Sequence, residues 1–270
     1  MSGSMGKFDT IKVDYKNSIY NILLNRPERL NAFNEQMFNE LNKALDVINN
    51  DNLAKAVVIT GSGRAFCSGG DVGGFFIKMI EDRQAGKKPF DIPGWMTSTG
   101  LLMHSLSIPV IAAINGAAIG FGFTLCLQCD IRIASEDALI GLPFVKLGII
   151  PEYGCTYILP RLVGIGKACE LLYTGKTVKA REALDIGLVN SVVPASVLLS
   201  VAQSTADDIS QGAVIALKKT KQALHSGLKN DFSQQLKLEE QSLDETLRTL
   251  DHEEAIRAFL AKKRPEFKGR

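Results

Sequence analysis

The sequence predicts an α/β fold in which a mixed core is followed by a helical C-terminal subdomain. Short apolar runs of the kind that form buried strands recur up to residue 193, and two of them lead into glycine-rich loops. After Pro194 the strand signals stop, and helical periodicity with many charges continues to the end. The 270 residues, 46% hydrophobic and 22% charged, suffice for one large globular domain or two small ones.

The core is expected to open with a β-hairpin and a helix. Residues 11–15 alternate between apolar and polar, Lys16-Asn17 offers a turn, and residues 19–24 form a second short strand. Asn34 can then cap a helix. Its apolar face would be lined by Phe38, Leu41, Leu45 and Ile48.

The remaining strands are expected at short apolar runs. These runs cover residues 56–60, 110–114, 131–134, 138–140 and 188–193. The stretch 61–74 contains six glycines and is predicted to be a shaped loop. The boundary between core and C-terminal part is expected near residues 195–205, so we assign the core to residues 8–200 and the helical subdomain to residues 201–270.

Residues 1–7 are interpreted as a tag or disordered start, because small polar residues precede a second methionine, Met5, which we take as the native start. The uncharged stretch 101–129 is long enough for a membrane span, but Pro109 and several glycines interrupt it. A buried strand, a glycine turn and a buried helix are expected there instead, and no membrane span. With 31 basic and 29 acidic residues, the net charge of +2 gives no reason to expect a nucleic-acid partner.

The five cysteines indicate an intracellular, soluble protein, because an odd number in a chain of this length is typical of reduced thiols. Cys126 and Cys129 form a C-x-x-C, but no second ligand pair is present for zinc, so no metal site is expected. Buried structural thiols are favoured, and a redox pair remains the alternative. The C-terminal Lys-Gly-Arg is not a peroxisomal address, and the compartment stays open.

Two strand-to-loop junctions, at residues 64–71 and 115–122, consist largely of small residues that leave backbone N–H groups uncovered. Two such N–H groups converging on one oxygen would form an oxyanion hole. Taken singly, each junction is better read as a tight turn.

The two junctions, taken together with further blocks, resemble the crotonase, or enoyl-CoA hydratase/isomerase, superfamily. The blocks lie at residues 25–32, 65–71, 108–116, 129–130, 147–151, 159–164, 187–190 and 258–259, with Lys262 beyond them. The resemblance covers the chain from about Phe8. It implies a spiral of β-β-α repeats, a helical C-terminal subdomain that assembles a homotrimer or a dimer of trimers, and a coenzyme A thioester as the substrate. It implies no metal and no redox cofactor.

The resemblance also implies which residues form the site. The thioester carbonyl would accept hydrogen bonds from the N–H groups of Gly70 and Phe121, the latter standing where the family usually has glycine. The substrate-binding residues would be Arg29, Ala32, Ala65, Ser68, Gly69, Asp71, Val72, Gly120, Pro151, Cys155, Phe259 and Lys262. Arg29 and Lys262 are phosphate partners or solvated surface charges, and Asp71 is read as holding its loop rather than as a base.

The acids that hydratases of this family use are absent, because the two positions hold Thr124 and Phe144. Hydratase activity is therefore not expected. Glu152 resembles the single carboxylate of the enoyl-CoA isomerase branch. Its neighbours Ile149, Ile150, Pro151 and Tyr153 should raise its pKa by excluding water.

The expected function is to shift the double bond of a 3-enoyl-CoA to give the 2-trans-enoyl-CoA in unsaturated fatty acid β-oxidation. Glu152 would act as the single base, and Gly70 and Phe121 would stabilise the enolate. The alternatives are another crotonase-type isomerase, a thioesterase and a non-catalytic acyl-CoA-binding module. Apolar residues at 75–96 could line the acyl site or pack at a subunit interface, and the sequence does not separate these.

Overall fold

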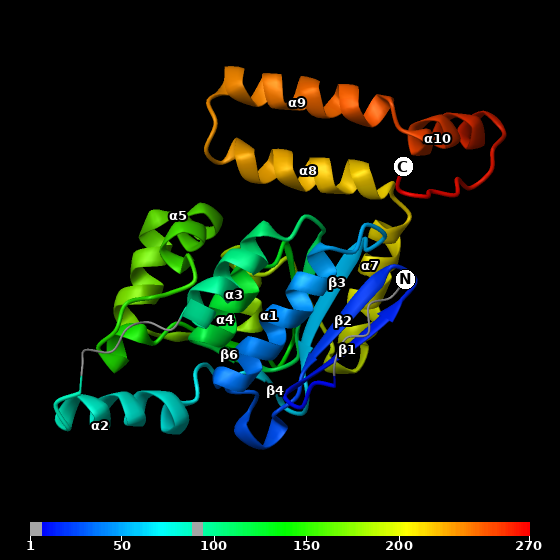
Figure 1. Cartoon of the computed structure of the whole chain (residues 1–270). Coiled ribbons are helices and arrows are strands. Elements are labelled where there is room, and N and C mark those ends of the chain that lie inside the picture. The colour runs from blue at the N-terminus through cyan, green and yellow to red at the C-terminus, as the bar shows by residue number, and fades with distance from the viewer. Residues whose placement is uncertain (1–6, 88–93) are drawn as a thin grey trace.

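The computed structural model describes residues 7–87 and 94–270, so residues 1–6 of the predicted tag, and Phe90 and Ile92, lie outside the described part. Two sheets form the core (Figure 1). The six-stranded sheet has the order β1-β2-β3-β5-β7-β10, and the four-stranded sheet has the order β4-β6-β8-β9. The larger sheet comprises β1 (Ile11–Lys16), β2 (Ile19–Leu24), β3 (Ala56–Gly61), β5 (Val110–Ile114), β7 (Ile131–Ser135) and β10 (Ser191–Val193). The smaller one comprises β4 (Ala65–Cys67), β6 (Ala117–Ile119), β8 (Leu139–Gly141) and β9 (Thr177–Lys179).

The chain passes from the large sheet to the small one in each repeat. β3 is followed by β4, β5 by β6, and β7 by β8, and the strands that neighbour each other within a sheet along this series are parallel. Helices complete the repeats, namely α2 (Lys78–Gln84) and α3 (Gly94–Ser105), then α4 (Phe121–Leu127), then α5 (Cys155–Thr174). This is the spiral of β-β-α repeats that the resemblance implies, and the α/β fold class is confirmed.

The predicted opening hairpin is present. β1 and β2 pair antiparallel, with Lys16 opposite Ile19, so that only Asn17 and Ser18 form the turn. Both turn residues have positive φ, 53° and 64°, as a type I′ turn requires. The predicted helix is α1 (Glu35–Asn49), whose cap Asn34 accepts a 3.0 Å hydrogen bond from Met37 N. Its buried face contains all four of the predicted apolar residues.

The prediction that residues 61–74 form a loop is partly wrong. It contains β4, and it ends in a π-helical segment, Val72–Ile77. β4 has three residues, all buried. It forms because β6 pairs with it in parallel, and no local sequence pattern predicts this pairing. The strand predicted at residues 188–193 is shorter, since only residues 191–193 pair with β7.

Successive turns of the spiral approach each other closely at Gly122 on α4. A Cβ at this position would lie 2.2 Å from the carbonyl oxygen of Cys67 at the end of β4. No side chain can be placed there without moving the backbone, so glycine at this position sets the distance between β4 and α4.

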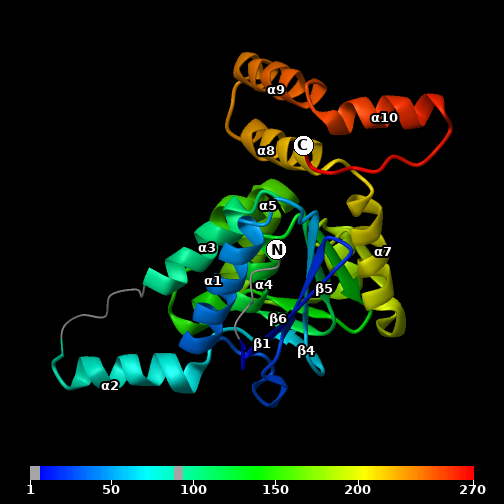
Figure 2. The ribbon, with the colours of Figure 1, turned by 45° about the vertical axis from the view of Figure 1, so that its right-hand side comes forward.

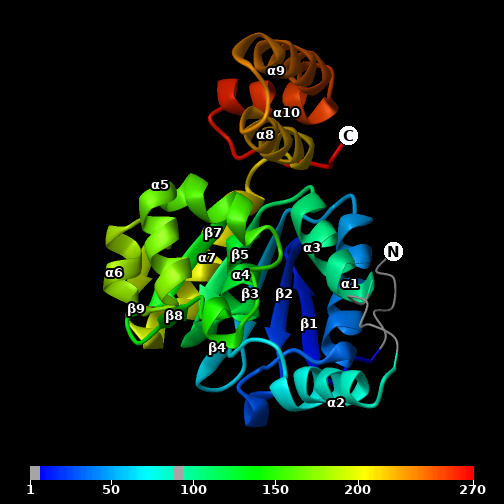
Figure 3. The ribbon, with the colours of Figure 1, turned by 90° about the vertical axis from the view of Figure 1, so that its left-hand side faces the viewer.

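Helix α7 (Leu198–Ser210) covers the face of the large sheet opposite to α1 and α3 (Figure 2). Leu198, Ala202 and Ala206 pack there against Val58 and Ile111. The predicted division at residues 200/201 therefore falls inside a helix that packs on the core. Helices α8 (Val214–Gly227), α9 (Phe232–Leu247) and α10 (Leu250–Leu260) form a separate layer above the sheets, whereas the short α6 (Ala180–Asp185) belongs to the core (Figure 3).

A buried ion pair joins this helical layer to the core. Lys221 of α8 lies 2.7 Å from the Asp130 carboxylate and also donates to Ile108 O at 2.9 Å. Asp130 accepts further hydrogen bonds from Val110 N at 2.8 Å and lies 3.1 Å from His225 Nε2. Burial would raise the pKa of Asp130, but the His225 and Lys221 contacts hold it below its usual value.

The thiols of the C-x-x-C are buried, as the sequence favoured. Cys126 Sγ donates to Gly122 O within α4, and burial raises the pKa of Cys129 to about 12. The uncharged stretch 101–129 is divided among the end of α3, β5, β6 and α4. Across residues 7–87 and 94–270, no helix is long and apolar enough to cross a membrane.

Candidate active site

Two pockets meet at Glu152. We call the first the amide pocket, because both glycine loops line it, with Gly70 from one and Phe121 from the other. We call the second the side pocket, which extends between α3 and the start of α5 and is lined by residues such as Leu101 and Tyr157. Glu152, Phe76 and Ile149 border both.

The amides of Gly70 and Phe121 are uncovered. A short bridge ties the Gly70 loop to Phe33, which donates to Gly69 O at 2.9 Å and accepts from Asp71 N at 2.8 Å. This pattern uses the residues on either side of Gly70 and leaves its own N–H without an acceptor. Phe121 is the first residue of α4, where a helix has no internal acceptor for the N–H. Among the described residues, neither amide donates a hydrogen bond.

The loop that carries the Gly70 amide depends on an unusual backbone conformation at Gly69. Its φ is +112°, which L side chains rarely adopt, and a Cβ there would lie 3.1 Å from Ile119 O. The sequence therefore folds into this shape only with glycine at residue 69.

The Phe121 side chain, which replaces the family's usual glycine, is accommodated in an aromatic cluster. Its ring centroid lies 4.6 Å from that of Phe33, 4.9 Å from Phe38 and 4.5 Å from Tyr153. Edge-to-face contacts of this kind stabilise aromatic cores. The side chain is only 3% exposed, so it packs away from solvent while its N–H remains available.

Asp71 holds its loop through two contacts. Its carboxylate accepts a 3.1 Å hydrogen bond from Gly74 N and forms a 3.1 Å ion pair with Arg26. Partial burial acts to raise the pKa of Asp71, but the Gly74 amide and Arg26 outweigh it and lower the pKa. A carboxylate held in this way is a weak base, which agrees with the predicted loop-holding role.

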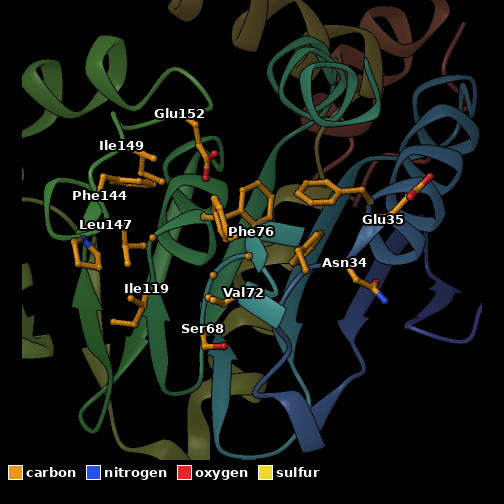
Figure 4. A pocket seen from close by; sticks show the side chains of 17 residues that line it. Asn34, Glu35, Ser68, Val72, Phe76, Ile119, Phe144, Leu147, Ile149 and Glu152 are labelled. Atoms are coloured by element: carbon orange, nitrogen blue, oxygen red, sulfur yellow. The ribbon is translucent and has the colours of Figure 1, made fainter. Parts of the chain in front are cut away.

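Glu152 stands on the loop between Pro151 and α5, and its side chain points into the amide pocket (Figure 4). Burial raises the pKa of this carboxyl to about 7. Within the described part of the chain the carboxylate has no hydrogen-bond or ion-pair partner that would counter this effect. The expected rise in pKa is confirmed. Its shielding comes from half-buried neighbours such as Ile149 and Tyr153, whereas Ile150 is 82% exposed.

The two positions at which hydratases of the family carry acids contribute no titratable group. Thr124 is fully buried, and its hydroxyl donates to Phe121 O at 3.1 Å. Phe144 is 3% exposed and borders the amide pocket. Glu35 also lines this pocket, but it is exposed and its carboxylate points away from Glu152 (Figure 4).

The structure brings some of the predicted substrate-binding residues together and leaves others apart. Those that line the amide pocket are Ser68, Gly69, Val72 and Gly120, and Pro151 lines the side pocket. Those that line neither pocket are Arg29, Ala32, Ala65, Asp71, Cys155, Phe259 and Lys262. Cys155 is fully buried, whereas Phe259 is 80% exposed on α10, in the helical layer.

Sequence reasoning missed most of the side pocket. Phe76 and Met79, from the segment whose role was left open, line it, whereas the side chains of Phe75, Trp95 and Met96 are not described. His104, Gln128 and Lys229 were not expected at the site at all. They come from α3, the end of α4 and the end of α8, and no local pattern connects them.

The fold and the arrangement of the two glycine loops define a crotonase-type enzyme. Residues 14–270 match the family described as enoyl-CoA hydratase/isomerase. The chain is 39% identical over 251 residues to a short-chain-enoyl-CoA hydratase of Clostridium acetobutylicum, covering 92% of this chain and 94% of the relative. It is 34% identical over 258 residues to a 1,2-epoxyphenylacetyl-CoA isomerase of Escherichia coli, covering 93% and 95%.

A solved structure gives the same result. The crystal structure of an enoyl-CoA hydratase from Bacillus anthracis is similar with a TM-score of 0.89 and 37% identity, over 97% of this chain and all of the other. The chain therefore belongs to the enoyl-CoA hydratase/isomerase family, as an enzyme of the crotonase superfamily.

Proposed function

We propose that this protein moves the double bond of a 3-enoyl-CoA into conjugation with the thioester, giving the 2-trans-enoyl-CoA of β-oxidation. The observation that carries the proposal is Glu152, whose carboxylate has no partner among the described residues and a pKa raised to about 7. It lines the same pocket as Gly70 and Phe121, whose amides donate no hydrogen bond within that part of the chain. The pocket combines one base with two hydrogen-bond donors, which is what a proton shift next to a thioester requires.

The substrate's thioester oxygen would accept hydrogen bonds from the Gly70 and Phe121 amides, which together act as an oxyanion hole. Glu152 takes a proton from carbon 2, and the electrons of that C–H bond move to the thioester oxygen, giving a dienolate. The protonated Glu152 then returns the proton to carbon 4. The double bond now joins carbons 2 and 3, and the Glu152 carboxylate is restored.

The pKa of about 7 suits both halves of this cycle. A carboxylate with an ordinary pKa would be too weak a base to remove the carbon-bound proton efficiently. A base whose pKa lies near the working pH is ionised in about half of the molecules and still accepts the proton strongly.

Hydration is the second candidate, because a relative with 39% identity is named as a hydratase. Addition of water needs one group to activate the water and another to deliver a proton to carbon 2. Thr124 and Phe144 cannot supply this pair, and Glu35 is directed away from Glu152 (Figure 4). We therefore place hydration below isomerisation.

The predicted coenzyme A contacts of Phe259 and Lys262 need a second copy of the chain. Within one chain both residues lie outside the two pockets, on or just after α10. In the homotrimer or dimer of trimers that we propose, they would act on the coenzyme A bound to a neighbouring copy.

The test is incubation with 3-hexenoyl-CoA, followed at the absorbance of the conjugated thioester. A rising signal supports the isomerase. A hydratase would instead leave 3-hexenoyl-CoA unchanged. When supplied with 2-hexenoyl-CoA, it would cause the absorbance of the conjugated thioester to fall. Release of free thiol would indicate a thioesterase, and acyl-CoA binding without turnover would indicate a binding module.

A further inference from the structure

Where the side pocket adjoins a neighbouring depression, its lining is polar and basic. Near Glu152 its lining is apolar, with Phe76, Met79 and Ile149. Where it adjoins the depression, the pocket is bordered by His104 of α3 and by Lys229, just after α8. A pocket that served only methyl-ended chains would gain nothing from a charged end.

His104 and Lys229 also border a neighbouring depression, which we call the basic cleft. It lies between the end of α3 and α8, and its basic residues are His104, Lys218, Lys219, Lys221, His225 and Lys229. No carboxylate is among the described residues that line it. The side pocket therefore borders a cluster of basic side chains.

Part of this charge is already neutralised. Lys221 and His225 contact Asp130, and Lys219 pairs with Glu245. In the chain as described, Lys218 and Lys229 form no ion pair. Lys229 is thus the unneutralised cation that borders both the side pocket and the basic cleft.

Two further groups support the polar character of this end. Burial lowers the pKa of His104, the neighbours His225 and Lys229 lower it further, and a hydrogen bond with the Gln128 side chain acts against them. The Tyr157 hydroxyl, in the lining of the side pocket, is buried and makes no hydrogen bond among the described residues.

We infer that the side pocket accepts an acyl chain whose far end carries a carboxylate, that is, the mono-CoA thioester of a dicarboxylic acid. This rests on the proposed function, which places the thioester in the amide pocket and the rest of the acyl chain beyond Glu152. The chain would follow the apolar stretch, and its terminal carboxylate would lie against Lys229, with His104 as a further hydrogen-bond donor.

The test measures binding of saturated thioesters, which cannot react. Hexanoyl-, octanoyl- and decanoyl-CoA are compared by calorimetry with the mono-CoA thioesters of hexanedioic, octanedioic and decanedioic acid. We expect the carboxylate-ended member to bind at least about tenfold more tightly at one of these lengths, the scale of one charge-assisted hydrogen bond. In Lys229→Met the ratio of the two dissociation constants should fall close to one. The matched control Lys237→Met, at an exposed position of α9, should keep the wild-type ratio.

Methyl-ended chains that bind as tightly at every length would overturn the inference, and so would a preference that survives in Lys229→Met. If the basic cleft binds free anions instead, inorganic phosphate will bind there while no carboxylate preference appears, which also overturns it. Because no double bond is involved, the outcome is independent of isomerase activity. Failure of the proposed function shows instead as absence of turnover of 3-hexenoyl-CoA.

Discussion

A carboxylate that is buried without a partner destabilises the fold unless it is protonated, and Glu152 is such a group. We expect Glu152→Gln to reduce isomerisation by roughly 10²–10⁴-fold, since the amide keeps the size but cannot take a proton. The wild-type rate should rise with pH and level off above the pKa of about 7, because only the ionised form is the base. Stopped assays with 3-hexenoyl-CoA across pH 5–9 check both points, and a variant as fast as the wild type would remove Glu152 from the mechanism.

The same substitution should stabilise the protein at high pH. Burial raises the folded-state pKa of Glu152 from 4.5 to about 7, so between these values the folded state holds a proton that the unfolded state has lost. The free energy of unfolding therefore falls as pH rises through this window, by on the order of 3 kcal/mol. Urea unfolding of Glu152→Gln should show greater stability than the wild type at pH 8, and the difference should shrink towards pH 4.5. Equal differences at both pH values would contradict the assigned pKa.

The Gly70 amide can be tested because the fold does not use it. Gly70→Pro removes the N–H without removing any backbone hydrogen bond among the described residues. We expect turnover to fall at least about a hundredfold, the usual effect of losing one oxyanion donor. Gly70→Ala is the matched control, because it keeps the N–H and its Cβ would lie 3.5 Å from Phe76 Cε2, an ordinary contact. Normal turnover in a folded Gly70→Pro protein would show that this amide does not bind the thioester.

At the scale of the elements, the close approach of β4 and α4 should make Gly122 intolerant of any side chain. A Cβ there would meet Cys67 O at 2.2 Å, so Gly122→Ala must push the two elements apart. We expect a loss of about 1–3 kcal/mol or more in the free energy of unfolding. Gly166→Ala, inside α5 with nothing within 4 Å of its Cβ, should instead be neutral or slightly stabilising. Denaturant unfolding of both variants checks this, and equal effects would contradict it.

The sequence predicted elements well where the signal is local. The hairpin, α1 and the strands β3, β5 and β7 follow from apolar periodicity and a cap, all of which lie within a few residues. β4 was missed because its three residues become a strand only when β6 pairs with them. The partner of this short strand lies some 50 residues further along the chain, and local periodicity does not predict such a distant pairing.

The candidate site divides in the same way. Glu152, Gly70 and Phe121 lie within motifs that the family resemblance could align, and they line one pocket. Cys155 was carried along with its motif although it faces the core. His104 of α3 and Gln128, just after α4, meet in the core, and the packing of α8 on the core adds Lys229.

At the scale of the whole molecule, the helical layer of one chain leaves large apolar side chains exposed. Leu236 and Leu243 of α9 are 49% and 58% exposed, and Phe259 and Leu260 of α10 are 80% and 76% exposed. Apolar surface of this extent is typical of an interface. We expect light scattering at micromolar concentration to give three or six times the 29.3 kDa of one chain. Leu243→Glu should lower this mass, and a wild-type mass of one chain would refute the assembly.

The meeting of the two pockets at Glu152 has a consequence for how such an enzyme can diversify. The two amides are positioned by tight glycine contacts at Gly69 and Gly122, where few substitutions are tolerated, and Glu152 stands on the loop before α5. The side pocket is built largely from residues outside the sheets, such as Met79 of α2 and Leu101 of α3. Substitutions there alter the shape of the side pocket without disturbing the strands. The architecture thus separates the catalytic groups from the walls that contact the acyl chain, so that substitutions at a few helical positions can change specificity without altering the chemistry.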